Sequence, residues 1–240
     1  MKRICLILLL MILSAAGTTV RAQAIPFAFG SETLHYTVSH NLVPGTIGTM
    51  TFRGSDQGDG YQVEAVLNAS LTSLYTLDCT YRSTFRKDAD LTPVRSTRDH
   101  KEKKYWVKSR YDWSAPGTVR LDVRKSSRPP RNETLEWSGT VRDLLDAIWW
   151  LRTRDYSRGT AADRGDNALL LDHDALPIRI ASAEHKTVRR GGRSVPVIEV
   201  CVMQGDKEGL RLLLSDDARH TPLRFSIALP FGTIKGNLKE

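Results

Sequence analysis

The chain has 240 residues, with 35 Lys and Arg against 27 Asp and Glu, and 40% of its residues are hydrophobic. A charged fraction of 26% is typical of a folded globular chain and argues against wholesale disorder. Beyond the first twenty residues no apolar run approaches the roughly 20 residues that a membrane-spanning helix needs, which excludes a multispanning protein of that kind.

Residues 1–24 have the features of an export signal. Two basic residues precede an apolar core over Ile4–Leu13, and Ala22-Gln23-Ala24 supplies the small-x-small pattern of a cleavage site. We therefore expect a mature chain that begins at Ile25, has no transmembrane span and is exported, to the periplasm. A retained membrane anchor is the alternative, but the apolar stretch is short for that role.

Loss of the signal removes three basic residues and no acid, so the net charge falls from +8 to +5. An exported protein meets lipid headgroups, acidic glycans and other proteins as its anions. We expect a lipid or an envelope protein as partner, and no nucleic acid.

Alternation of apolar and polar residues predicts strands over 33–38, 46–52, 61–67, 119–123 and 223–229, with Gly-rich or Pro-containing turns recurring between them. The expected fold is mainly β, a curled antiparallel meander (barrel or half-barrel) that forms a single β-rich domain over 25–240. The polar, proline-broken segment Lys125–Glu133 could be a linker, although one continuous sheet is the simpler interpretation.

One amphipathic helix is predicted over Val141–Arg154. Thr140 and Asp143 fit a capping box at its start, and Gly159 is a plausible stop. An apolar stripe follows helical spacing and comprises Val141, Leu144, Leu145, Ile148 and Leu151. Because the predicted strands each present one dry face, we expect this stripe to be buried against the sheet.

Three segments together resemble an exported bacterial family known as domain of unknown function 3108. They are the opening Phe29–Tyr36 with Gly45, the apolar helix Asp143–Arg152, and the closing Leu212–Asp217 with Pro222, Gly232 and Leu238. Asp146 stands where the family motif has a small polar residue such as Ser. The resemblance implies an all-β exported domain curved around a helix, and it brings no catalytic residues.

The mature chain contains two cysteines, Cys79 and Cys201, which can pair in an oxidising compartment or remain as buried free thiols. No CxxC motif or Cys/His ligand spacing is present, so we expect no metal and no cofactor.

Catalytic signals are weak. The chain lacks GxSxG, SxxK and HExxH, which leaves it uncertain as an enzyme and inclines us against one. Asp172-His173-Asp174 fits a solvated turn better than a metal site, because neighbours in an extended chain point to opposite faces. Three histidines, His100, His185 and His220, sit in polar surroundings and look exposed. Asp216 and Asp217 are the carboxylates that a hydrolase of envelope polymers would use, although a hairpin end is the simpler interpretation.

Twelve basic residues and only four acids lie between Arg95 and Arg131, and aromatic residues are interleaved with them. Two interpretations remain open: a surface that meets lipid headgroups, or a solvated outer face whose aromatics turn inward. The candidate ligand or partner surface comprises Trp149, Trp150, Arg152, Tyr105, Trp106, Lys103 and Lys104.

The first functional hypothesis is a non-catalytic envelope module that binds an apolar ligand or a partner segment in the concavity of the sheet. The alternatives are a scaffold for an envelope complex that uses the basic face, and a carboxylate-dependent hydrolase.

Overall fold

The computed structural model describes residues 29–72, 75–157, 166–171, 174–229 and 232–240. The predicted signal over 1–24 lies outside the described residues, as do Gly159 and the first two residues of Asp172-His173-Asp174.

The described part of the chain forms fifteen strands and one helix. The first eight strands are β1 (Glu32–His40), β2 (Val43–Asp56), β3 (Gly60–Thr72), β4 (Tyr75–Arg86), β5 (Pro93–Glu102), β6 (Tyr105–Ala115), β7 (Thr118–Lys125) and β8 (Arg128–Glu136). Next come β9 (Thr140–Arg142), α1 (Leu144–Arg152), β10 (Asn167–Leu171), β11 (Asp174–Arg190), β12 (Arg193–Gln204), β13 (Lys207–Ser215), β14 (Pro222–Leu229) and β15 (Gly232–Leu238).

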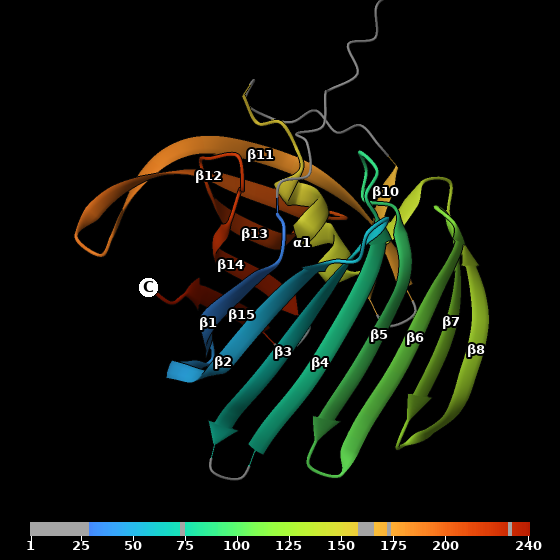
Figure 1. The fold of residues 1–240 in the computed structure, drawn as a ribbon. Helices are drawn as coiled ribbons and strands as arrows, with labels where there is room; N and C mark the ends of the chain where they lie inside the picture. The colour runs from blue at the N-terminus through green and yellow to red at the C-terminus, as the bar shows by residue number, and fades with distance from the viewer. Residues whose placement is uncertain (1–28, 73–74, 158–165, 172–173, 230–231) are drawn as a thin grey trace, which may run out of the picture.

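All fifteen strands belong to one sheet, in the order β8-β7-β6-β5-β4-β3-β2-β1-β15-β14-β13-β12-β11-β10-β9. Neighbours are antiparallel except for β9 and β10, and the pairing of β1 with β15 joins the two halves of the chain. The sheet curls around α1, and β8 and β9 form its two ends (Figure 1). The predicted fold class is therefore confirmed, in the form of a curled sheet that does not close into a barrel.

Because antiparallel strands alternate in direction, every second turn falls at the same edge of the sheet. We call lower edge the one that carries the turns β1–β2, β3–β4, β5–β6 and β7–β8, at the bottom of Figure 1. The upper edge carries the turns β2–β3, β4–β5, β6–β7 and β13–β14. We call the part of the space inside the sheet that lies nearer the upper edge the upper half, and the part nearer the lower edge the lower half.

The segment that the sequence allowed as a linker is instead the β7–β8 turn and the edge strand β8. Two prolines, Pro129 and Pro130, occupy this strand, and seven of its nine residues are exposed. Proline and charge on an exposed edge strand hinder pairing with another chain, which explains why this sequence lacks the alternation of a central strand.

The helix is shorter than predicted because its start lies further along the chain. Asp143 is the N-cap, and its carboxylate accepts a hydrogen bond from the Asp146 amide at 2.8 Å. Thr140, expected as the cap, belongs to strand β9 together with Val141. Since β9 pairs with β10, this three-residue strand takes the backbone groups that a longer helix would have used.

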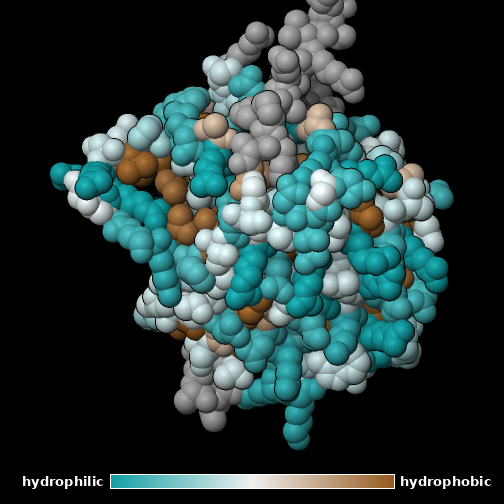
Figure 2. All heavy atoms as spheres, in the orientation of Figure 1, coloured by the Kyte–Doolittle hydropathy of each residue, from teal (hydrophilic) through white to brown (hydrophobic). Residues whose placement is uncertain are grey.

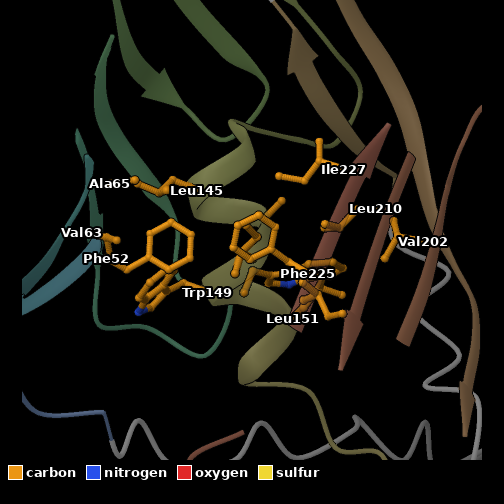
Figure 3. Close-up of a cluster of buried hydrophobic side chains, with 14 of the residues drawn as sticks. Phe52, Val63, Ala65, Leu145, Trp149, Leu151, Val202, Leu210, Phe225 and Ile227 are labelled. Atoms are coloured by element: carbon orange, nitrogen blue, oxygen red, sulfur yellow. The ribbon is translucent and has the colours of Figure 1, made fainter. Parts of the chain in front are cut away.

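The core fills the space between α1 and the concave face of the sheet. Figure 3 shows α1 between Phe52, Val63 and Ala65 on one side and Leu210 and Phe225 on the other. The predicted burial of the helical stripe is confirmed for Leu145, Ile148 and Leu151, which are all at most 6% exposed; Leu144 is partly buried and Val141 lies in β9.

A second, smaller cluster joins the two ends of the curled sheet. It comprises Val107, Tyr111, Val119, Leu121 and Val123 from β6 and β7, with Val141, Ala168 and Leu170 from β9 and β10. The Trp113 indole NH also donates to the Val141 carbonyl at 2.8 Å. Apolar packing thus brings β6 and β7 close to β9 and β10 without a hydrogen-bonded ladder between the ends of the sheet.

The face that Figure 2 shows is largely hydrophilic, with scattered hydrophobic residues. This agrees with strands that bury one face and solvate the other. Within the described residues, the only helix is α1, and none is long and apolar enough to cross a membrane.

Candidate ligand-binding concavity

The helical part of the predicted ligand surface lies in the core. Trp149 and Trp150 are 0% and 3% exposed, and the Trp149 ring packs edge-on against Phe52 at a centroid distance of 5.5 Å. Arg152 is also buried, at 1% exposure. These three side chains are therefore not an accessible binding surface, which corrects the prediction, because the concave face of the sheet surrounds the helix on its aromatic side.

Arg152 instead holds the end of α1 to the upper edge. Its guanidinium pairs with the Glu32 carboxylate, at 2.5 Å from Nη1 and 3.1 Å from Nη2, and donates to the carbonyls of Arg219 and His220. It also lies over the rings of Phe29 and Trp149. A buried arginine needs such a full set of acceptors, since an unpaired buried charge is strongly destabilising.

Arg142, just before the helix, makes the equivalent attachment at the other end of α1. Its guanidinium donates to both carboxylate oxygens of Asp146 at 3.1 Å and to the carbonyls of Asp90 and Leu91 in the β4–β5 turn. The cap residue Asp143 accepts a short hydrogen bond from Ser83 on β4. Both ends of α1 are thus fixed to the upper edge by buried polar groups, and the sequence patterns did not predict the burial of Arg142, Asp146 or Glu32.

The packing of the concavity changes from the upper half to the lower half. Near the helix attachments the inward-facing side chains are closed to solvent, with exposed fractions of 0–1% at Tyr36, Phe52, Val63, Phe85, Leu212, Leu214 and Phe225. Toward the lower edge the apolar wall keeps 5–8% exposure at Ile47, Met50, Leu67, Ala69, Ile178, Ile180, Ile227 and Ile234. The inward-facing side chains are therefore buried in both halves, and those toward the lower edge are slightly less completely buried than those near the helix attachments.

The inner wall of β4 and β5 carries polar groups next to this apolar wall. Cross-strand register pairs Tyr81 with Arg98 and Cys79 with His100, and all four share the inward face with buried Ser83. The Arg98 guanidinium lies over the Tyr81 ring, 5.5 Å from its centroid, and hydrogen-bonds with the Cys79 thiol. A cation thus stands on the inner wall, where the strand pattern alone gave no reason to place one.

Charge on this wall is set by burial. Desolvation raises the pKa of Tyr81 and of Cys79, although Arg98 pulls both values down. Both groups are consequently neutral at pH 7, and the Cys79 thiol has no thiolate character that would make it a nucleophile. The arginine remains charged, so this stretch of wall combines neutral hydrogen-bonding groups with a single positive charge.

His100, expected to be exposed, is only 14% exposed at its side chain and faces inward beside Glu102 and Tyr105. His220 is also buried, and its ring Nδ1 lies 2.8 Å from the Arg152 carbonyl. His185 is exposed as expected, with Nδ1 2.9 Å from Asp216 Oδ2. Polar sequence neighbours misled the assignment of His100 because on a strand the neighbours face the opposite side. His220 lies in the β13–β14 turn and is buried by its contact with the end of α1, which is distant in sequence.

The lysine and aromatic residues of the predicted surface lie at the β5–β6 turn, but on different faces. Lys103 and Lys104 form the exposed turn itself. Tyr105 turns toward His100 on the inner face, whereas Trp106 pairs across strands with Lys101 on the outer face. The two rings are 36% and 38% exposed and thus remain accessible.

Higher up the outer face, the basic residues of the run are compensated by acids. Asp112 lies 2.6 Å from both Arg95 and Arg110, Asp99 pairs with Lys108, and Asp122 pairs with Arg124. This ladder of ion pairs agrees with the interpretation of a solvated outer face. The inward position of Tyr111 also agrees, since it is 5% exposed in the smaller hydrophobic cluster that joins β6 and β7 to β9 and β10.

The two cysteines are free thiols on opposite faces of the sheet. Cys79 on β4 faces the concavity, whereas Cys201 on β12 lies beside Glu208 and Arg211 on the outer face. The disulfide that the sequence allowed is not formed, because a bridge needs Cβ atoms about 4 Å apart. Buried free thiols, the other expectation, are what the structure contains.

The candidate carboxylates have structural partners. Asp217 accepts hydrogen bonds from Ser215 and from the amides of Arg219 and His220, and it thereby shapes the β13–β14 turn. Asp216 pairs with His185. Within the described residues no group of three or more His, Cys, Asp or Glu side chains could hold a metal ion.

A hollow of about 410 Å³ lies apart from the concavity, at β1–β3. Its lining is polar and includes Arg53, Gln62 and Glu64, of which the first and third form an ion pair at 2.9 Å. Pockets for apolar ligands are lined mainly by apolar side chains, so this hollow does not fit the predicted ligand.

A curled, unclosed antiparallel sheet around one buried helix thus defines the class of protein by fold. The chain belongs to the family described as protein of unknown function (DUF3108), whose sequence profile matches residues 33–239. No curated protein matches the chain.

A solved structure, described as a β-barrel-like protein of the domain of unknown function DUF1849 from Brucella abortus, is similar to this chain at 13% sequence identity. The match covers 88% of this chain and 97% of that one, with a TM-score of 0.49.

Proposed function

We propose that this protein is an exported cell-envelope module that binds an apolar ligand with an acidic or polar end, without catalysing a reaction on it. The bound molecule occupies the lower half of the concavity. The export part of the proposal rests on the sequence of residues 1–24 alone. The binding part rests on the contrast in packing between the two halves.

The observation that carries the proposal is an apolar wall that is less completely buried in the lower half than in the upper half, on the same concave face as the charged Arg98. A wall closed by its own side chains would resemble the upper half, where exposure falls to 0–1%. Ile180, Ile227 and Ile234 keep 8% instead. Burial of such surface by a ligand is favourable at about 25 cal/mol per Å², and Arg98 offers a charge-assisted hydrogen bond to a carboxylate or phosphate.

The state of Tyr81 and Cys79 and the position of the two candidate carboxylates favour binding over reaction. Tyr81 and Cys79 are held neutral by burial, and the carboxylates Asp216 and Asp217 are engaged in turn and ion-pair contacts away from this wall. A hydrolase would need two carboxylates that converge about 5–10 Å apart in one cleft. Asp216 and Asp217, at the β13–β14 turn, do not form such a pair in the lower half.

Binding of a dansyl-labelled long-chain fatty acid to the purified protein tests the proposal. We expect fluorescence enhancement that saturates at one site, and about tenfold weaker binding by Arg98→Gln because a charge-assisted hydrogen bond is lost. Arg95→Gln is the matched control: it lies on the same strand but faces outward to Asp112, and it should bind like the wild type.

A second variant tests the location of the ligand. Ile227→Phe should fill the lower half and abolish binding, whereas Ala228→Phe, one residue along and outward-facing, should leave binding intact. Equal binding by the wild type and by Ile227→Phe would refute the proposal, provided that circular dichroism shows both proteins folded.

A further inference from the structure

Two neighbouring hairpin turns on the lower edge are joined into one rigid tip. The Trp106 amide donates to the Ser126 hydroxyl at 3.2 Å, and the Ser126 amide donates to the Trp106 carbonyl at 3.0 Å. The β5–β6 turn with Lys103 and Lys104 therefore stands beside the β7–β8 turn with Arg128. We call this surface the basic tip, and define it as Lys101, Lys103, Lys104, Trp106 and Arg128.

The basic tip carries positive charge that the described residues do not neutralise. Its four cations are exposed, and none of them forms an ion pair with the described part of the chain. This distinguishes them from the paired cations higher on the same strands, such as Arg95 and Lys108. The sequence showed an excess of charge over about forty residues, and the fold concentrates its uncompensated part at one end of the sheet.

Large apolar side chains accompany this charge on the same edge. The Trp106 side chain is 38% exposed and Tyr105 is 36% exposed, directly after the two turn lysines. Leu42, in the β1–β2 turn of the lower edge, is 70% exposed. Figure 1 shows these hairpin turns at the bottom of the sheet, below the helix.

We propose that the lower edge docks on an anionic lipid bilayer through the basic tip. Lysine and arginine attract acidic headgroups at the membrane surface, and tryptophan and tyrosine favour the boundary between headgroups and acyl chains. The two hairpin turns present basic and aromatic side chains together at the end of the sheet. An acidic protein would satisfy the charge, but it would offer no boundary layer for the exposed rings.

Docking by the lower edge would bring the proposed ligand site close to the membrane, although docking does not depend on ligand binding. The inner wall that keeps solvent exposure lies toward this same edge, so docking would place the lower half of the concavity over the bilayer. The basic tip itself is made of outward-facing and turn residues. Docking through the basic tip is therefore tested independently of ligand binding at Arg98.

Sedimentation with vesicles tests the proposal on the full-length protein purified after export. We expect binding to vesicles of phosphatidylcholine mixed with phosphatidylglycerol, and little binding to phosphatidylcholine alone. The triple variant Lys103→Gln/Lys104→Gln/Arg128→Gln should bind the anionic vesicles about 100-fold more weakly, since each cation near the surface contributes separately.

The matched control removes the same charge elsewhere. Arg120, Arg189 and Arg193 are exposed and lie outside the lower edge, so Arg120→Gln/Arg189→Gln/Arg193→Gln should retain binding. Equal losses in the two triple variants would show that net charge alone attracts the protein, which overturns the proposal. Binding to soluble poly-glutamate but not to vesicles would overturn it in favour of an acidic polymer.

Tryptophan emission supplies a second readout. The difference spectrum between the wild type and Trp106→Phe should shift to shorter wavelength when anionic vesicles are added, because the indole leaves water. An unshifted difference spectrum would count against insertion of the tip. Binding of the dansyl fatty acid in solution should be unchanged in the basic-tip variant, which separates failure of docking from failure of ligand binding.

Discussion

The upper and lower halves of the concavity are lined by the same sheet but are stabilised differently. In the upper half, buried charged groups fix α1 to the upper edge of the sheet, and aromatic rings pack against it with exposures near zero. In the lower half, the apolar wall belongs to the same core cluster as α1, and its aliphatic side chains keep exposures of 5–8%. The contrast predicts that the side chains of the upper half contribute more to stability than those of the lower half. Paired substitutions in the two halves test this division.

The largest effect is expected where a buried ion pair is broken. Arg152→Leu leaves the Glu32 carboxylate buried without its partner and should cost about 3–5 kcal/mol in free energy of unfolding. Arg154→Leu is the control, because Arg154 pairs with a largely exposed Asp90 and should lose only about 1 kcal/mol. Urea unfolding measures both. Similar losses of unfolding free energy in the two variants would show that the buried Arg152–Glu32 pair does not contribute more to stability than an exposed pair.

Deletion of the same side chain in each half should give unequal losses. Ile148→Ala, in the closed upper core at 1% exposure, should cost about 4 kcal/mol, toward the upper end of the usual range. Ile227→Ala, at 8% exposure, should cost about 2 kcal/mol because water can fill part of the space. Melting temperatures and urea midpoints in detergent-free buffer compare them. A larger loss at Ile227 would reverse the comparison.

A larger side chain should likewise destabilise the upper half more than the lower half. Leu212→Phe inserts volume where Leu212 is 0% exposed, and overpacking of this kind costs about 1–3 kcal/mol. Ile227→Phe should cost less than about 1 kcal/mol, because Ile227 keeps 8% exposure and the added atoms can extend toward solvent. The same unfolding assay decides between them, and an equal penalty would mean that the lower half is as tightly filled as the upper one.

The smallest effect is expected at an exposed contact near the upper edge. Asp216 and the Tyr156 carbonyl both accept from His185, so hydrogen bonds to them raise the pKa of this histidine. Because the folded pKa lies above the unfolded value near 6.5, the pair stabilises the fold below that pH, and its contribution is lost as pH rises through the folded pKa. The imidazole is half exposed, so the change should stay below about 1 kcal/mol.

Urea unfolding at about pH 5 and about pH 8 measures this contribution, with His185→Gln as the reference. The wild type should lose its small advantage over the variant at the higher pH. An advantage that grows with pH would show that the neutral imidazole is the favoured form in the folded protein.

Some elements were predictable because their signal is local. Alternation located the strands around Leu121 and Phe225, and helical spacing located Leu145 and Ile148 on a buried stripe. The boundary of the helix was not predictable, since Thr140 can cap a helix or extend a strand equally well. The pairing of β9 with β10, which is far along the chain, decided between the two.

The lower-half wall illustrates what the sequence could not place. Strand β5 reads Pro-Val-Arg-Ser-Thr-Arg-Asp-His-Lys-Glu, and its inward face is itself polar, with Ser96, Arg98 and His100. Without a hydrophobic period, no pattern says which residues face the concavity. The buried roles of Arg142, Asp146 and Glu32 were missed for a related reason: charged residues are normally solvated, and only partners distant in sequence make their burial possible.

The sequence by itself determined the mainly β class, the presence and burial of one apolar helix, and the family to which the chain belongs, because each depends on residue patterns along a short stretch. The tertiary structure alone decided that α1 occupies the upper half, that Trp149, Trp150 and Arg152 are core residues, and that Arg98 faces inward while the basic tip faces out. The physical reason is that curl and register bring together groups from opposite ends of the chain, and contacts at that range leave no trace in local periodicity.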